Sequence, residues 1–365
     1  MTMVQEKNKI TVRQTLIIFG LSTLSSAIRL FPTVCSKKGH SAGWLAPVFG
    51  AAALFAAFII LAALFKNSEV ASLADAFTRA LGGAGGKILL AAYLFWLLIL
   101  YFLFIRYYAE RLLSSIYPNT DLRFLFICML SVTFIAARKR IDFLARFCEL
   151  SFLIFLITLT VFYILLIPTI KIENVLPVTH KDFFPVLDSS IQIIGIWGFI
   201  TFFFFMGDHI KNKRQLKSHR NKTILYLFGL TTLILFFVIG SLGADAASRM
   251  PLPFFNSTKL ISIMPAFDRF EAVLLSVWVI SDFILIASFA IIIMNILKKI
   301  TAVSEPKYFS SPMVFLGYIG GLFIANNRFE LERLSTTTQS SLILCVLAYV
   351  IPLAVLVIGK IRKTL

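Results

Sequence analysis

Asp282 is the residue of this sequence best suited to a chemical role. It is a carboxylate in the middle of a long apolar stretch. If that stretch crosses a membrane, an ionised carboxylate there costs at least roughly 2.5–3.5 kcal/mol on insertion scales. Asp282 therefore needs compensation: a proton, the amine of a bound ligand, or a base such as Arg29. The competing interpretation is a structural pair or a protonated hydrogen-bonding group. Ser281, directly before it, is a further candidate ligand contact.

Four hydroxyl side chains cluster in the first apolar segment, ahead of Pro32: Ser22, Thr23, Ser25 and Ser26. Such a cluster binds a zwitterionic small molecule well where a helix is unwound, because half-helix N-termini then face the carboxylate. Serine and threonine also serve close helix packing, and they bond carbonyls of their own helix. The sequence leaves both interpretations open.

A second candidate break lies in the sixth apolar segment, at Gly195 and Gly198. Each glycine costs roughly 1 kcal/mol in helix propensity, so a pair within one helix requires a reason. The glycines either unwind the helix beside a ligand or allow close packing of a neighbouring helix. In the first case Trp197 and Phe199 line a cavity.

Aromatic residues of the third apolar segment are further candidate cavity contacts, namely Tyr93, Trp96 and Tyr101; in a chain with 38 phenylalanines, the alternative is bulk that faces lipid. Other chemistries find little support. The four cysteines are dispersed without a CxxC pair, and no histidine lies inside an apolar block, so we expect no metal and no cofactor. No catalytic constellation is present, and we expect no enzyme.

The elements that carry these residues are predicted to be membrane-spanning helices. Of the 365 residues, 59% are hydrophobic and 15% charged, whereas soluble domains are roughly half apolar and about a quarter charged. Ten segments have about the length that a bilayer core demands. They lie near 13–34, 43–65, 87–111, 122–137, 146–167, 187–207, 222–242, 270–297, 310–326 and 339–359.

The net charge of +17 comes from Lys and Arg residues whose positions agree with the predicted topology. More than half of the 35 Lys and Arg residues fall in alternate connections, which are cytoplasmic if both termini are cytoplasmic. No recognition motif accompanies these basic runs, so nucleic acid is excluded as a partner. The predicted protein is an all-α integral membrane protein with ten transmembrane helices.

The ten segments divide into two sets of five within a single transmembrane domain, 1–365. The first repeat covers about 13–167 and the second about 187–359. The first segment of each set carries a candidate helix break, at residues 20–26 and 195–198. Breaks at corresponding positions are typical of transporters with an inverted repeat, so we predict a five-plus-five fold of the LeuT type.

One stretch resembles a known family. Residues 268–280, DRFEAVLLSVWVI, resemble the RFE…LL.VW.I signature of spore germination receptor B subunits, the GerAB family. Residues 174–178, NVLPV, fit the same family, as does the pattern from Phe203 through Met206 and His209 to Lys211. The resemblance covers essentially the whole chain in order.

This resemblance implies a subunit within the amino acid–polyamine–organocation permease superfamily, located in the spore inner membrane. It implies recognition of a small nutrient germinant, an amino acid or a sugar, in a midplane cavity. Partners would be an A subunit, a C subunit and the lipid bilayer. The alternatives are a proton-coupled amino acid or polyamine permease, and a scaffold that has lost its ligand. Asp282 is not part of the family motif, so its role rests on physics alone.

Overall fold

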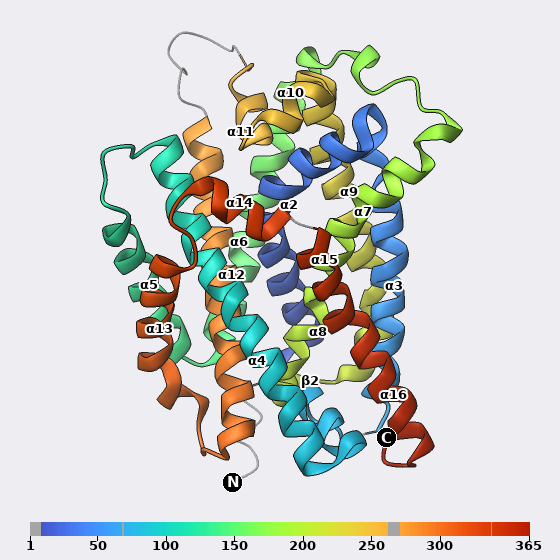
Figure 1. Cartoon of the computed structure of the whole chain (residues 1–365), viewed down its shortest axis with the longest axis vertical. Helices are drawn as coiled ribbons and strands as arrows, with labels where there is room; N and C mark the ends of the chain where they lie inside the picture. Colours follow the sequence, from blue (N-terminus) through green and yellow to red (C-terminus); the bar gives the residue numbers. More distant parts are fainter. Residues whose placement is uncertain (1–8, 68, 262–270, 337) are drawn as a thin grey trace.

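The computed structural model describes residues 9–67, 69–261, 271–336 and 338–365. Its helices run roughly along the long axis of the molecule and form a bundle (Figure 1). A two-residue parallel pairing joins β1 (Ile10–Thr11) to β2 (Ile210–Lys211). β2 and the C-terminal end of the chain lie at the same end of the bundle (Figure 1).

Within the described residues, which exclude residue 270, a helix occupies each of the ten predicted segments. The first five correspond to α2 (Val12–Gly39), α3 (Pro47–Leu64), α4 (Leu73–Ser115), α5 (Leu122–Arg138) and α6 (Ile141–Leu166). The next four are α7 (Phe183–Trp197) with α8 (Phe199–Phe203), then α9 (Leu216–Leu242), α12 (Glu271–Thr301) and α13 (Ser310–Phe323). The last comprises α15 (Thr338–Cys345), a π-helical turn (Val346–Val350) and α16 (Ile351–Ile361). Shorter helices are α10 (Ala244–Arg249), α11 (Pro253–Thr258) and α14 (Arg328–Thr336).

By length and composition, the described residues contain eight helices able to cross a membrane, or nine if α13 and α14 form one bent span. The axes of that pair differ by 108°. α5, with 17 residues, is shorter than the eight. An all-α membrane protein is therefore confirmed, since only helices and closed barrels satisfy their backbone groups in lipid.

Local sequence fixes where several helices begin. The Thr11 hydroxyl accepts from the backbone of Gln14, whose side chain accepts from the backbone of Thr11 in return. Ser72 and Asp75 form the same reciprocal cap at the start of α4. These caps satisfy N–H groups that have no partner inside the helix.

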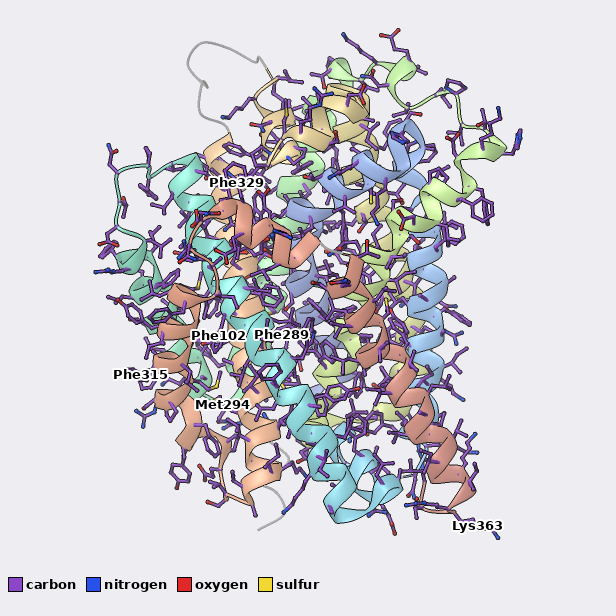
Figure 2. All side chains as sticks on the ribbon, viewed as in Figure 1. Phe102, Phe289, Met294, Phe315, Phe329 and Lys363 are labelled. Atoms are coloured by element: carbon purple, nitrogen blue, oxygen red, sulfur yellow. The ribbon has the colours of Figure 1, made fainter. Side chains whose placement is uncertain are left out.

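Three spans form the interior of the bundle. In α2, the α7–α8 span and α12, 89% of the residues in the most apolar stretch are buried, against 28% in α6. Outer helices expose large apolar side chains, as Phe315 of α13 does, and the interior is filled by side chains such as Phe289 of α12 (Figure 2). Lipid favours this distribution, because apolar groups there need no burial in protein.

The predicted break in the first segment is wrong. α2 is one helix from Val12 to Gly39, and it continues through residues 20–26 and past Pro32. The physical reason is visible at Thr23, whose hydroxyl donates to the carbonyls of Phe19 and Gly20 of its own helix, at 3.1 and 2.9 Å. Hydroxyls that bond within the helix need no unwinding. The sixth segment does change at Gly198, where α7 ends and α8 begins.

Candidate functional site

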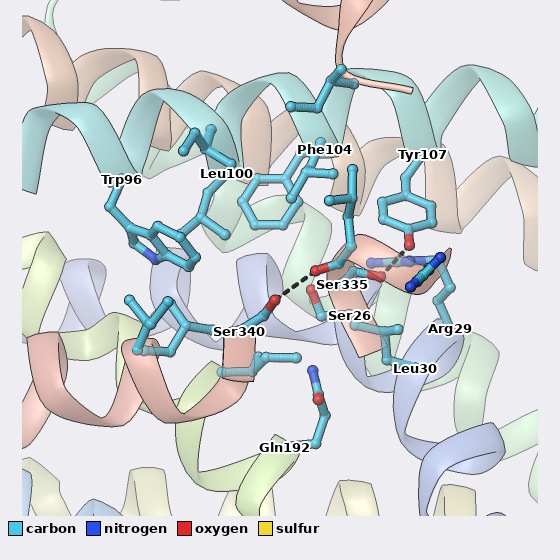
Figure 3. Close-up of a pocket in the computed structure, with 18 of the residues that line it drawn as sticks. Ser26, Arg29, Leu30, Trp96, Leu100, Phe104, Tyr107, Gln192, Ser335 and Ser340 are labelled. Carbon is cyan, nitrogen blue, oxygen red and sulfur yellow. Dashed lines mark hydrogen bonds between the residues drawn. The ribbon is translucent and has the colours of Figure 1, made fainter. Parts of the chain in front are cut away.

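A cavity of about 550 Å³ lies among α2, α4, α7, α8, α14 and α15. Its wall is largely apolar and aromatic, with a few polar side chains that lie opposite the aromatic residues of α4 (Figure 3). Aromatic members are Trp96, Phe104, Tyr107 and Phe199, and polar members include Ser26, Arg29, Gln192, Glu330 and Arg333. A cavity of this size and lining is typical of a site for a small molecule.

Arg29 of α2 carries the buried positive charge of this wall. Arg29 is 8% exposed, and its guanidinium carbon lies 3.2 Å from the centre of the Tyr107 ring. Among the described residues, no carboxylate lies within ion-pairing distance of Arg29. A buried cation without a carboxylate is costly, and the cavity beside it gives an anionic group access.

α14 closes one side of the cavity and is tied to α4 through Tyr107. The Tyr107 hydroxyl donates to the carbonyl of Leu331 at 2.8 Å and contacts the hydroxyl of Ser335. Glu330 is the acidic residue of the cavity wall, and it accepts from the backbone of Asn326 at 2.8 Å. The side chain that holds Arg29 therefore also holds α14.

Asp282 lies in a neighbouring buried cluster and not in the cavity wall. It forms an ion pair with Arg111 of α4 and accepts from the Ser25 hydroxyl. The Trp278 indole donates to Ser25 at 3.2 Å, and its ring centre lies 4.3 Å from the Arg111 guanidinium carbon. Of the roles open to Asp282, the structure shows pairing with a base. That base is Arg111 and not Arg29.

Three of the residues predicted to contact a ligand line the cavity together: Ser26, Trp96 and Phe199. The other hydroxyls of α2 lie outside the wall. Ser25 binds Asp282, Thr23 bonds its own helix, and Ser22 is buried on α2. Ser281 donates to the carbonyl of Leu21 at 2.6 Å and joins α12 to α2.

The glycines of the sixth segment pack against the last span. A Cβ atom on Gly198 would lie 2.5 Å from the Cβ of Ala348, and one on Gly195 would lie 3.2 Å from the Ser341 carbonyl oxygen. The distance at Gly198 leaves no room for a Cβ atom, and the distance at Gly195 would be a tight contact. Close helix packing therefore accounts for both glycines.

The remaining predicted aromatics are buried in packing contacts. Trp197 packs on Gly50, where an added Cβ would lie 3.0 Å from its ring. The Tyr93 hydroxyl donates to the Leu347 carbonyl in the π-helical turn. Tyr101 lies against Gly317, where an added Cβ would lie 2.8 Å from its ring.

Sequence reasoning missed several residues of the cavity wall. Gln192 is a polar side chain inside an apolar segment, a signal that could have singled it out. Glu330 and Arg333 were expected in a connection after the ninth span, but they lie on α14, which bends back over the cavity. No local sequence pattern predicts the bend between α13 and α14.

Comparison with known proteins decides the family. Residues 9–329 match the sequence model of the family described as spore germination protein. The chain belongs to this family. It is similar to spore germination protein KB of Bacillus subtilis (strain 168), with 24% identity over 288 residues, which cover 76% of this chain and 75% of the relative.

The resemblance to the GerAB family seen in the sequence is thereby confirmed. Of the motif that carried it, residues 268–270 lie outside the described residues, and the rest forms the start of α12. Trp278, within that motif, donates to Ser25 in the cluster around Asp282. The family signature thus includes a residue that supports the buried ion pair.

Proposed function

We propose that this protein is the membrane subunit of a nutrient-germinant receptor and binds a small nutrient, an amino acid above all, in the cavity beside Arg29. The observation that carries the proposal is the buried guanidinium of Arg29 at a cavity of about 550 Å³. Membership of the spore germination protein family supports the role in germination. The cavity volume falls within the range of about 300–1,000 Å³ that is usual for small ligands.

The wall matches the parts of an amino acid. Arg29 offers a planar donor for a carboxylate, and Glu330 offers an acceptor for an ammonium group. Trp96 and Phe199 offer apolar surface for a side chain. Gln192, whose amide oxygen accepts from Ser341, leaves its other polar atom for the ligand.

The signalling step in this proposal is a shift of α14. A ligand that binds Arg29 competes with the Tyr107 ring, and Tyr107 also holds α14 through Leu331. Ligand binding then biases the position of α14, which partner subunits read. A ligand shifts such an equilibrium only by its differential affinity for the two states.

The wider setting belongs to the same proposal: a five-plus-five repeat within residues 1–365, the spore inner membrane, A and C partner subunits, and cytoplasmic termini. Two observations support the cytoplasmic termini. β1, which pairs with β2, and the end of α16 lie at one end of the bundle, as an even number of spans requires (Figure 1). The basic connections around Lys213 and Lys299 lie at that end as well.

A proton-coupled permease is the second candidate, favoured by the buried carboxylate of Asp282. Such carboxylates mark proton relays in transporters. Purified full-length protein in liposomes separates the two functions. A receptor binds its amino acid without accumulating it inside the vesicles, whereas uptake driven by a proton gradient would establish the permease.

The ligand class is tested by thermal unfolding of the purified chain with the twenty amino acids, their carboxyl amides and a set of sugars. We expect stabilisation by one or more free amino acids and weaker stabilisation by the matching amide. The reason is that the amide lacks the charge that Arg29 binds. Stabilisation by a neutral sugar alone would contradict the proposal.

A further inference from the structure

A second hollow lies at the end of the bundle that holds β2, between the end of α3 and the start of α9. Its volume is about 740 Å³. One part is apolar, formed by α3 residues such as Phe58, Ile59 and Ala62. The other part holds five cationic side chains and no acidic one: Lys66, Lys213, Arg214, Lys217 and Arg220.

Among the described residues, none of these five cations forms an ion pair with a carboxylate, although Asp208 and Asp75 lie near enough to Lys213 to stabilise its charge. Two of them lie over aromatic rings: the Lys213 ammonium is 5.0 Å from the Phe65 ring centre, and the Arg220 guanidinium is 4.0 Å from that of Phe55. Lys213 also donates to the carbonyl of Ala71. These contacts hold the positive charges at the hollow.

A second basic hollow offers a contrast. It lies near the ends of α5 and α12, and its cations are Arg138, Lys139, Arg140, Lys298 and Lys307. Two of these five have carboxylate partners, since Lys307 pairs with Glu305 and Arg140 pairs with Asp142 at 3.2 Å. Part of the positive charge of this hollow is therefore compensated within the protein. The α3–α9 hollow keeps its positive charge unpaired beside an apolar wall.

We propose that the α3–α9 hollow binds an anionic phospholipid, with its phosphate on the cations and its acyl chains along α3. Charge complementarity selects this occupant: guanidinium and ammonium groups bind phosphate strongly. Ile59, 50% exposed, continues the apolar wall toward the lipid-facing surface. Because acyl chains move from one hydrocarbon environment to another, the apolar part positions the lipid while the charges supply selectivity.

The test is native mass spectrometry of the full chain, delipidated in detergent and titrated with phosphatidylglycerol or with phosphatidylcholine of the same acyl chains. We expect tighter binding of phosphatidylglycerol. The double variant Arg214→Gln with Lys217→Gln should weaken that binding about tenfold or more, since each cation near an anionic lipid contributes roughly fivefold in affinity. The control is Lys360→Gln with Lys363→Gln, which removes the same charge from the end of α16 (Figure 2).

Ala62→Phe is an independent test of the lipid site, because it fills the apolar part of the hollow and leaves every cation in place. It should weaken phosphatidylglycerol binding, because the acyl chains can no longer lie along α3. Equal phosphatidylglycerol binding by the two double variants, or unchanged phosphatidylglycerol affinity in Ala62→Phe, would overturn the proposal. So would displacement of the lipid by glycerol phosphate at equal concentration, because the ligand would then be a free anion and the acyl chains would contribute nothing.

Discussion

Arg29 and Arg111 are two buried arginines with opposite arrangements. Arg111, 3% exposed, lies over Trp278 and pairs with Asp282, which also accepts from Ser25. Arg29, 8% exposed, lies over Tyr107 and faces a cavity, with no carboxylate at ion-pairing distance among the described residues.

We infer from this difference that the charge of Arg111 is structural, whereas the proposed function gives Arg29 a role in ligand binding. A buried ion pair whose remaining lone pairs are hydrogen-bonded holds helices in register, and the loss of one partner is strongly destabilising. A buried cation beside a cavity keeps its binding capacity for a ligand. Removal of Arg111's partner should therefore affect folding, whereas removal of Arg29 should affect binding.

The largest effect is expected at Asp282. Asp282→Asn leaves the Arg111 charge unpaired in the interior, so the free energy of unfolding should fall by about 3–5 kcal/mol. Thermal unfolding of the purified protein and its abundance in membranes measure the change. Ser281→Ala, which removes one hydrogen bond to Leu21, is the neighbouring control and should lose only about 1 kcal/mol.

A double variant sharpens this prediction. Asp282→Leu combined with Arg111→Met removes both charges and should recover much of the lost stability. Normal abundance and an unchanged melting temperature in Asp282→Asn would contradict the structural role of the pair.

Packing at Gly198 should give the next largest effect. Gly198→Ala places a methyl group against Ala348, so we expect a loss of about 1–3 kcal/mol with no change in ligand affinity. The matched control is Gly229→Ala on α9, where nothing lies within 4 Å of the added Cβ, and which should be neutral or slightly stabilising. Weaker ligand binding in Gly198→Ala at unchanged stability would place this glycine in the binding site.

The smallest effect is expected at Tyr107. Tyr107→Phe keeps the ring over Arg29 and removes the bond to the Leu331 carbonyl, which should lower stability by about 0.5–1.5 kcal/mol. It should also increase hydrogen exchange in α14. Tyr101→Phe is the control, since the Tyr101 hydroxyl has no hydrogen-bond partner among the described residues. Equal exchange of α14 in the two variants would mean that Tyr107 does not hold this helix.

Much of the fold was predictable from the sequence, because lipid imposes strong rules on composition and segment length. The apolar segments gave the helices, including the short α5 and α13. The position of Asp282 in an apolar segment predicted that its carboxylate has a partner, since a single charge there is costly. The family was predictable from the motif at residues 268–280.

The candidate site was harder to predict from the sequence, because the residues of its wall are brought together only by the tertiary arrangement. Serine and threonine look alike in sequence whether they bond their own helix, as Thr23 does, or line a cavity, as Ser26 does. Glycines that allow packing, such as Gly198, resemble glycines that break a helix. The choice of Arg111 as the partner of Asp282 follows from the crossing of α4 and α12, which no local pattern specifies.

The central claim is that Arg29 binds the carboxylate of the nutrient, and one comparison tests it most directly. Dissociation constants are measured for the stabilising amino acid and its carboxyl amide in the wild type, Arg29→Gln and Arg106→Gln. Arg106 is a buried arginine of α4 that pairs with Glu110 at 2.8 Å outside the cavity wall.

Arg29→Gln should weaken binding of the free amino acid about tenfold or more and abolish its preference over the amide, because a hydrogen bond to a charged group contributes about 1.5–3 kcal/mol. Arg106→Gln should keep that preference even if the protein is less stable. An Arg29→Gln protein that is folded and still prefers the free amino acid as strongly as the wild type would contradict the account.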